Sequence, residues 1–245
     1  CDAPQTGGGL GHRALGEREG RLPAQVGIGL VGQRAVEQFV TGAPARGRHF
    51  RFLLYSHDSH GLGHLRRNLG IAGALRRRFP FAGIVIITGS PCATQFPLPD
   101  DCDIVKIPAI AKDRTGGYVP RNLGLSLDEA IALRRQLILA AYEAYDPDVV
   151  IVDHQPTGLL DEMTGVLERA QRHGKFVVFG MRDIVDAPAV VQKAWSSPAC
   201  KRAFEYCYDS VLVYGDRRVF DPLEEYPILA PLADKVSFTG YVVEP

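Results

Sequence analysis

The chain of 245 residues has few cysteines and no net charge, and each shortage excludes a class of function. Its five cysteines are an odd number without a Cys-X-X-Cys pair, so they indicate neither a zinc site nor a disulfide framework. Lysine plus arginine and aspartate plus glutamate both number 28, so no overall electric field draws the chain to nucleic acid. We therefore expect reduced thiols, a cytoplasmic protein and no nucleic-acid partner.

Long apolar runs are missing as well. None approaches the ~18–20 residues that span a bilayer, so we expect no transmembrane helix. The first part of the chain, residues 1–48, is rich in glycine, alanine and arginine, and its one apolar island is broken by glycine. We expect this segment to be a mostly disordered leader, because it offers too little apolar surface to bury.

From residue 49 onward, apolar runs alternate with amphipathic segments. Strands are expected at residues 50–56, 83–88, 103–107, 149–152, 176–180, 210–214 and 235–239, and a polar loop at residues 111–122. Helices are expected at residues 63–78, 125–145, 158–173 and 189–206, the last with a break near residues 197–198. The strand runs are aliphatic and do not alternate with polar residues, which is typical of a parallel sheet covered on both faces. The sequence therefore predicts an α/β domain over about residues 49–242, with a doubly wound, mostly parallel, Rossmann-like sheet.

A glycine-rich turn follows the first predicted strand and leads into the first predicted helix. Ligands of open α/β sheets collect at the carboxyl ends of the strands, where this turn lies. Its glycines, Gly61 and Gly63, would let the backbone approach a ligand closely. His64 would face the cleft at the start of the helix, where an imidazole can exchange a proton near neutral pH. The alternative is a purely structural turn in which His64 caps the helix.

Asp153 ends another predicted strand, where a buried carboxylate without a partner is costly. If its partner is the Nδ1–H of His64, the pair would orient and strengthen a general base. Alternatively, Asp153 caps a helix that begins near Thr157. The residues alone leave both interpretations open.

Two other strand ends carry candidate substrate-binding residues. Ser90 follows the strand at residues 83–88 and would offer a hydroxyl on the floor of the cleft. Arg182 follows the strand at residues 176–180 and would hold a phosphate or a sugar hydroxyl, or else form a local ion pair with Asp183.

Histidines and aspartates are dense enough at these strand ends to be weighed as metal ligands: His57, Asp58, His60, His64, Asp153 and His154. The spacing of His60 and His64 suits one face of a helix, but the intervening Gly-Leu-Gly places His60 before the helix. We therefore expect no metal site. The arginines at residues 66–67 and 76–78 suit either a membrane surface or, more commonly, a solvated helix face.

The run Tyr55-Ser56-His57-Asp58, followed by Gly61-Leu62-Gly63-His64, resembles the first loop of a bacterial group of predicted GT-B glycosyltransferases. These are relatives of glycosyltransferase family 28 and of the enzyme that forms lipid II by adding N-acetylglucosamine. Further segments match in the same order, and the resemblance covers about residues 49–243: residues 88–91, 152–153, 156–159, 180–184, 213–216 and 239–242. His60 departs from the group, whose members typically carry a bulky aromatic or another residue there.

The resemblance implies an inverting, metal-independent enzyme that needs no cofactor and transfers a hexosyl group from a nucleotide-sugar donor to an acceptor hydroxyl. This chain would be its N-terminal, acceptor-binding half, inactive alone because the C-terminal donor-binding domain is absent. The acceptor would be a small molecule, a glycan or a lipid, and the enzyme cytoplasmic or peripheral to the inner membrane face. The implied site has catalytic and substrate-binding members: His64 and Asp153, and Gly61, Gly63, Ser90 and Arg182.

Two other functions remain as alternatives. One is a sugar-nucleotide epimerase or hydrolase of the same fold, which would act on the donor without an acceptor. The other is a sugar- or nucleotide-binding module without catalysis.

Overall fold

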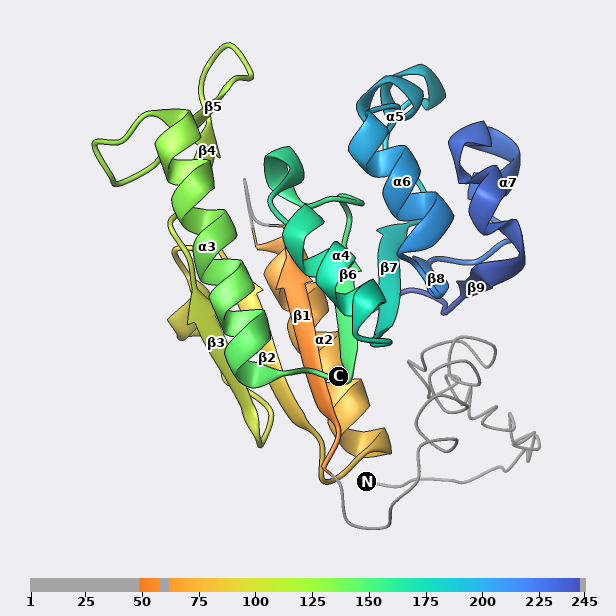
Figure 1. Cartoon of the computed structure of the whole chain (residues 1–245). Helices are drawn as coiled ribbons and strands as arrows, with labels where there is room; N and C mark the ends of the chain where they lie inside the picture. The colour runs from red at the N-terminus through yellow and green to blue at the C-terminus, as the bar shows by residue number, and fades with distance from the viewer. Residues whose placement is uncertain (1–48, 58–61, 243–245) are drawn as a thin grey trace, which may run out of the picture.

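A computed structural model describes residues 49–57 and 62–242 (Figure 1). Its main sheet has seven strands in the order β3-β2-β1-β6-β7-β8-β9, and every neighbouring pair is parallel. The strands are β1 (Arg51–Ser56), β2 (Gly83–Thr88), β3 (Cys102–Lys106), β6 (Val149–Asp153), β7 (Phe176–Arg182), β8 (Ser210–Tyr214) and β9 (Val236–Phe238). The predicted doubly wound parallel sheet is confirmed, and each strand expected from an apolar run is present.

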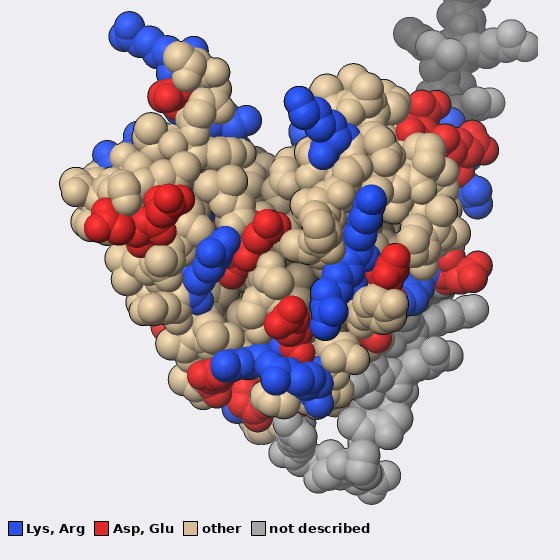
Figure 2. Space-filling view, turned by 45° about the horizontal axis from the view of Figure 1, so that its top comes forward, with Lys and Arg blue, Asp and Glu red and all other residues tan. Residues whose placement is uncertain are grey.

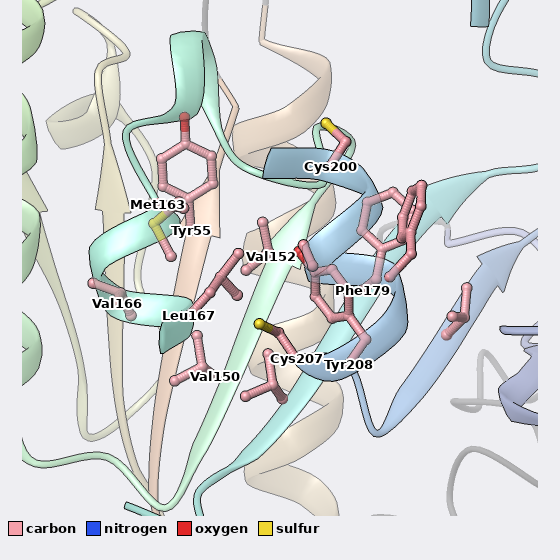
Figure 3. Close-up of a cluster of buried hydrophobic side chains, with 14 of the residues drawn as sticks. Tyr55, Val150, Val152, Met163, Val166, Leu167, Phe179, Cys200, Cys207 and Tyr208 are labelled. Atoms are coloured by element: carbon pink, nitrogen blue, oxygen red, sulfur yellow. The ribbon is translucent and has the colours of Figure 1, made fainter. Parts of the chain in front are cut away.

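Helices cover both faces of this sheet. The helices are α2 (Gly63–Arg78), α3 (Leu127–Tyr145), α4 (Thr164–Arg172), α5 (Pro188–Ala194), α6 (Pro198–Tyr206) and α7 (Pro222–Glu225), with 3-10 turns η1 (Ala93–Gln95), η2 (Leu159–Asp161) and η3 (Pro227–Lys235). Helices α3, α4 and α6 pack on one face, where the core contains Tyr55, Val152 and Phe179 (Figure 3). Helix α2 packs on the other face against Phe52 and Leu54. Successive side chains of β1 therefore pack into the cores on opposite faces of the sheet, as expected for a strand that is buried on both faces.

Two expectations about local structure were wrong. The helix expected at residues 158–173 begins only at Thr164, because left-handed backbone at Leu160 (φ 49°) and Asp161 (φ 61°) interrupts it. The loop expected at residues 111–122 contains an antiparallel hairpin, formed by β4 (Ile110–Lys112) and β5 (Tyr118–Pro120). Strands of three residues are too short to show a period in the sequence.

The strand ends that carry the candidate residues lie at one edge of the sheet, at the top of Figure 1. Strand β6 lies between β1 and β7, so the end of β1 neighbours Asp153, which pairs with Gly180 of β7. The expected leader at residues 1–48 lies outside the described residues. No helix in the described ranges is both long and apolar enough to cross a bilayer.

Candidate functional site

His64 and Asp153 meet at this edge of the sheet. His64 is the second residue of α2, and its Nδ1 lies 2.7 Å from Oδ2 of Asp153 at the end of β6. Burial opposes the charge of Asp153, but the hydrogen bond from His64 and the charge of Arg67 hold the pKa of Asp153 below its ordinary value. An ionised carboxylate only accepts hydrogen bonds, so Nδ1 of His64 carries the hydrogen, and in the neutral form of this imidazole Nε2 carries the lone pair.

This contact distinguishes the interpretations that the residues left open. Leu62, not His64, occupies the N-cap position of α2. Asp153 is completely buried and binds side chains of α2, whereas Gly158 and Met163 hold the N-cap positions of η2 and α4. The His64 side chain remains 18% exposed. The pair thus joins a buried carboxylate to an imidazole that solvent reaches.

Arg67 is a third member of this group that the sequence reasoning missed. Its Nη1 donates to Oδ1 of Asp153 at 2.8 Å, and its guanidinium lies 5.3 Å from the centre of the Tyr214 ring. A spacing of three residues places Arg67 and His64 on the same face of α2, which was the available signal. Asp153 is consequently held at both oxygens by one helix.

Two more imidazoles surround His64. The ring centres lie 4.8 Å apart for His64 and His154, 5.5 Å for His57 and His64, and 5.4 Å for His57 and His154. Burial, followed by the neighbouring His64, lowers the pKa of His154 to about 3. Burial and the neighbouring imidazoles also hold the pKa of His57 well below its ordinary value. Both rings are therefore neutral near pH 7.

The described residues contain no group of three His, Cys, Asp or Glu side chains able to hold a metal ion. Two members of the set weighed as metal ligands, Asp58 and His60, lie outside those residues, as does Gly61. No metal chemistry is assigned to the cluster.

The other sequence-predicted residues have different surroundings. Gly63 is exposed, and a Cβ built there would meet open space, so its contacts do not require glycine. Ser90 is buried, and its Oγ accepts the N–H of Cys92, which fixes the turn after β2. Arg182 is exposed, and the contact of its side chain within the described part of the chain is one of 3.4 Å with the carbonyl oxygen of Val185. Their roles in substrate binding remain predictions.

Asp183 is not the partner of Arg182. Its Oδ1 accepts the N–H of Ile184, and its Oδ2 accepts the hydroxyl of Tyr241 at 3.0 Å. The charge of Arg182 contributes to lowering the pKa of His154. Arg182 is therefore a cation at the edge of the histidine cluster.

A buried ion pair anchors the loop that follows β6. Arg134 of α3 donates from Nε to Oε2 of Glu162 at 2.6 Å, and the hydroxyl of Tyr55 donates to Oε1 of Glu162 at 2.6 Å. The same hydroxyl accepts the N–H of Leu159. The sequence carried one signal for this pair. Arg134 lies three residues after Ile131 and four before Ile138, so the arginine falls on the apolar face of α3.

The edge that carries the histidine cluster is hollowed between two lobes of the molecule (Figure 2). The hairpin β4–β5 and α3 rise toward the β3 end of the sheet, at the left of Figure 1, and α5 and α6 rise toward its β8 end, at the right. Among the described residues, cavities lie away from this edge, with about 720 Å³ between α2 and residues 96–100 and about 430 Å³ beside α4 and α6. Neither of these cavities is lined by a residue of the histidine cluster.

No protein-family model and no curated protein match this chain. Solved structures are similar to it at low identity. UGT2 of Phytolacca americana, complexed with UDP-2-fluoro-glucose and pterostilbene, is 14% identical, with a TM-score of 0.49 over 80% of this chain and 53% of that one. CalG4, the calicheamicin glycosyltransferase, is 16% identical, with a TM-score of 0.44 over 81% and 54%.

The glycosyltransferase SsfS6 of Streptomyces sp. SF2575 is 15% identical, with a TM-score of 0.40 over 67% of this chain and 50% of that one. The chain thus spans about half the length of these structures. Likenesses of this size establish no family for it.

Proposed function

We propose that this chain supplies the acceptor side and the general base of a glycosyltransferase. The enzyme would transfer a hexosyl group from a nucleotide-sugar to an acceptor hydroxyl, with inversion and without a metal. The observation that carries the proposal is the 2.7 Å contact between Nδ1 of His64 and the buried Asp153 at the hollowed edge of the sheet. The order of sequence motifs that resembles GT-B glycosyltransferases supports it.

In the proposed reaction, Nε2 of His64 accepts the proton of the acceptor hydroxyl. The acceptor oxygen forms a bond to the anomeric carbon, while the bond from that carbon to the nucleoside diphosphate breaks and its electrons leave with the diphosphate. Asp153 stabilises the imidazolium and keeps Nδ1 protonated, and Arg67 keeps Asp153 ionised. A positioned general base of this kind contributes ~10²–10⁴-fold in rate.

The acceptor is proposed to lie in the hollow above the strand ends, with Arg182 able to donate to a phosphate or hydroxyl group on it. The nucleotide-sugar is proposed to bind mainly to a second domain outside these 245 residues. Calorimetric titration of the chain with UDP-glucose tests this division. The expected result is no measurable binding, and tight binding would place the donor site on this chain instead.

Replacing His64 in the enzyme that contains this chain tests the proposed chemistry. With donor and acceptor present, His64→Ala is expected to lower kcat by ~10²–10⁴-fold, because the imidazole proposed to take the proton is removed. The matched control is His173→Ala, since His173 stacks on Tyr142 away from the site and its removal leaves turnover unchanged. Full activity of His64→Ala would remove this histidine from the mechanism.

Incubation with the donor alone separates transfer from the alternative chemistry. A transferase releases little free sugar without an acceptor. Accumulation of the epimer or of free sugar at the rate of the complete reaction would show an epimerase or a hydrolase.

A further inference from the structure

The proposed reaction uses His64 and leaves two imidazoles without a role, the buried His57 and the half-buried His154. Within the described residues, Nδ1 of His57 and Nδ1 of His154 have no hydrogen-bond partner. An unpaired buried polar atom is unfavourable, and His154 also has left-handed backbone, with φ 69°. Two unpaired nitrogens and one left-handed residue, all unfavourable to folding, therefore lie together beside His64.

The backbone holds His154 in this conformation. Its N–H donates to the carbonyl oxygen of Gly180 at 2.7 Å, continuing the pairing of β6 with β7 past Asp153. Because Asp153 and His154 are consecutive, the end of one strand supplies both the carboxylate at Nδ1 of His64 and a ring beside it. The rings of His154 and His64 are tilted by 46° at 4.8 Å.

His57 contacts His64 in a different geometry. It lies directly after β1, and its ring meets that of His64 edge-on, at 5.5 Å and 86°. His64 is thus bounded by an imidazole on two sides and by Asp153 at Nδ1. Within the described residues, neither His57 nor His154 bonds to His64 through its Nδ1, so the contact of each with His64 is one of ring against ring.

We propose that His154, with His57 beside it, is a positioning residue that holds the ring of His64 with Nδ1–H on Asp153 and Nε2 open to the acceptor. The kinetic consequence rests on the proposed function, whereas the orientation of His64 can be measured without any substrate. Histidine suits position 154 because it combines a flat ring with a residue type that is enriched in left-handed backbone.

Two substitutions separate ring shape from backbone conformation and polarity. His154→Phe keeps an aromatic ring and removes the nitrogens. His154→Asn removes the ring and keeps a residue that tolerates left-handed backbone. The distant His173→Asn serves as the matched control.

The readout is the tautomer of His64 in the full chain labelled with ¹⁵N-histidine and followed by NMR. The wild type, His154→Phe and His173→Asn are expected to show one tautomer, protonated at Nδ1. His154→Asn is expected to show a mixture of the two tautomers, because the ring of His64 is no longer confined. A single Nδ1–H tautomer in His154→Asn would overturn the proposal, and so would a mixture in His154→Phe.

The kinetic measurement distinguishes this inference from the proposed function. In the active enzyme, His154→Asn is expected to lower kcat by ~10–100-fold with little change in KM, and His154→Phe to restore most of it. If His64→Ala retains full turnover, the proposed function fails and the tautomer result stands by itself. If His64→Ala is inactive and His154→Asn leaves both the tautomer and kcat unchanged, only the positioning role fails.

Discussion

Gly180 of β7 shows how closely single residues are packed behind the site. A Cβ at this position would overlap the hydroxyl and the ring of Tyr214. That ring lies against Arg67, which in turn holds Asp153. Glycine at position 180 therefore leaves room for the ring that supports the carboxylate.

Substituting Gly180 is a direct test of this packing at the residue scale. Gly180→Ala is expected to lower the free energy of unfolding by about 1–3 kcal/mol, because a methyl group is forced into filled space. Gly165→Ala is the matched control, since a Cβ there meets open space within helix α4 and is expected to stabilise by up to ~1 kcal/mol. Urea denaturation measures both, and equal effects of the two substitutions would contradict the packing.

Two buried tyrosines allow a second comparison of single residues. The hydroxyl of Tyr214 has no partner among the described residues, whereas that of Tyr55 donates to Glu162 and accepts from Leu159. Tyr214→Phe is expected to leave the free energy of unfolding unchanged or to raise it by up to ~1 kcal/mol, and Tyr55→Phe to lower it by about 1–3 kcal/mol. Chemical denaturation checks the order, and a larger loss for Tyr214→Phe would show that its hydroxyl is bound.

Between elements, the ion pair of Arg134 and Glu162 connects helix α3 to the loop after β6. Both side chains are almost completely buried, and the same loop leads away from Asp153 and His154. A buried charge without its partner is strongly destabilising. The ion pair therefore holds the loop after β6 against α3, because either charge without the other would be buried and unpaired.

Removing one member of this pair tests it at the element scale. Arg134→Met is expected to destabilise the fold by about 3–5 kcal/mol, because Glu162 is left buried and charged. The neighbouring Arg135 is exposed and contacts the carbonyl oxygen of Leu160, so Arg135→Met is expected to cost ~1 kcal/mol or less. Thermal and urea unfolding give the comparison. A loss below ~1 kcal/mol for Arg134→Met would mean that Glu162 finds another partner.

Secondary structure was predictable where a pattern is local and long. The strand runs and the periodic stretch of α2 are such patterns, and the structure contains them with shifts of one or two residues at their ends. The hairpin β4–β5 was not predictable, because its turn depends on the Asp113 carboxylate binding the N–H groups of Thr115 and Gly117. The left-handed pair at Leu160 and Asp161 was not predicted either, because leucine rarely adopts this conformation and a single aspartate is too weak a signal for it.

At the scale of the whole molecule, the imidazoles of His57 and His154 link folding to pH. The pKa of His154 is about 3 when folded and about 6.5 when unfolded, so below pH 6.5 the unfolded chain binds a proton that the folded chain does not. Stability is present above pH 6.5 and falls as the pH decreases. His57 has the same sign, because its pKa is also lowered.

Stability measured between pH 7 and pH 4 tests this linkage. The free energy of unfolding is expected to fall by about 1.4 kcal/mol per pH unit for His154, and the slope to be shallower in His154→Asn. The titratable and charged groups that face His154 are His57, His64, Asp153, Arg182 and Arg67. Asp153 contributes in a separate pH range. Its lowered pKa stabilises the fold above about pH 4, the ordinary pKa of an aspartate, and this contribution is lost as the pH falls further. Identical slopes for both proteins would show that His154 is not held neutral.

The sequence by itself determined the class of fold and the edge of the sheet at which the reactive residues gather, because burial patterns and strand ends are local properties of the chain. It named His64 and Asp153 as candidates, and it left their contact open. Only the tertiary structure decided that contact, which joins residues 89 positions apart, and it added Arg67 and the orientation of His154. The physical reason is that the partner of a side chain depends on how α2 is rotated on the sheet and on which strand lies beside β1, and neither is encoded in a local pattern.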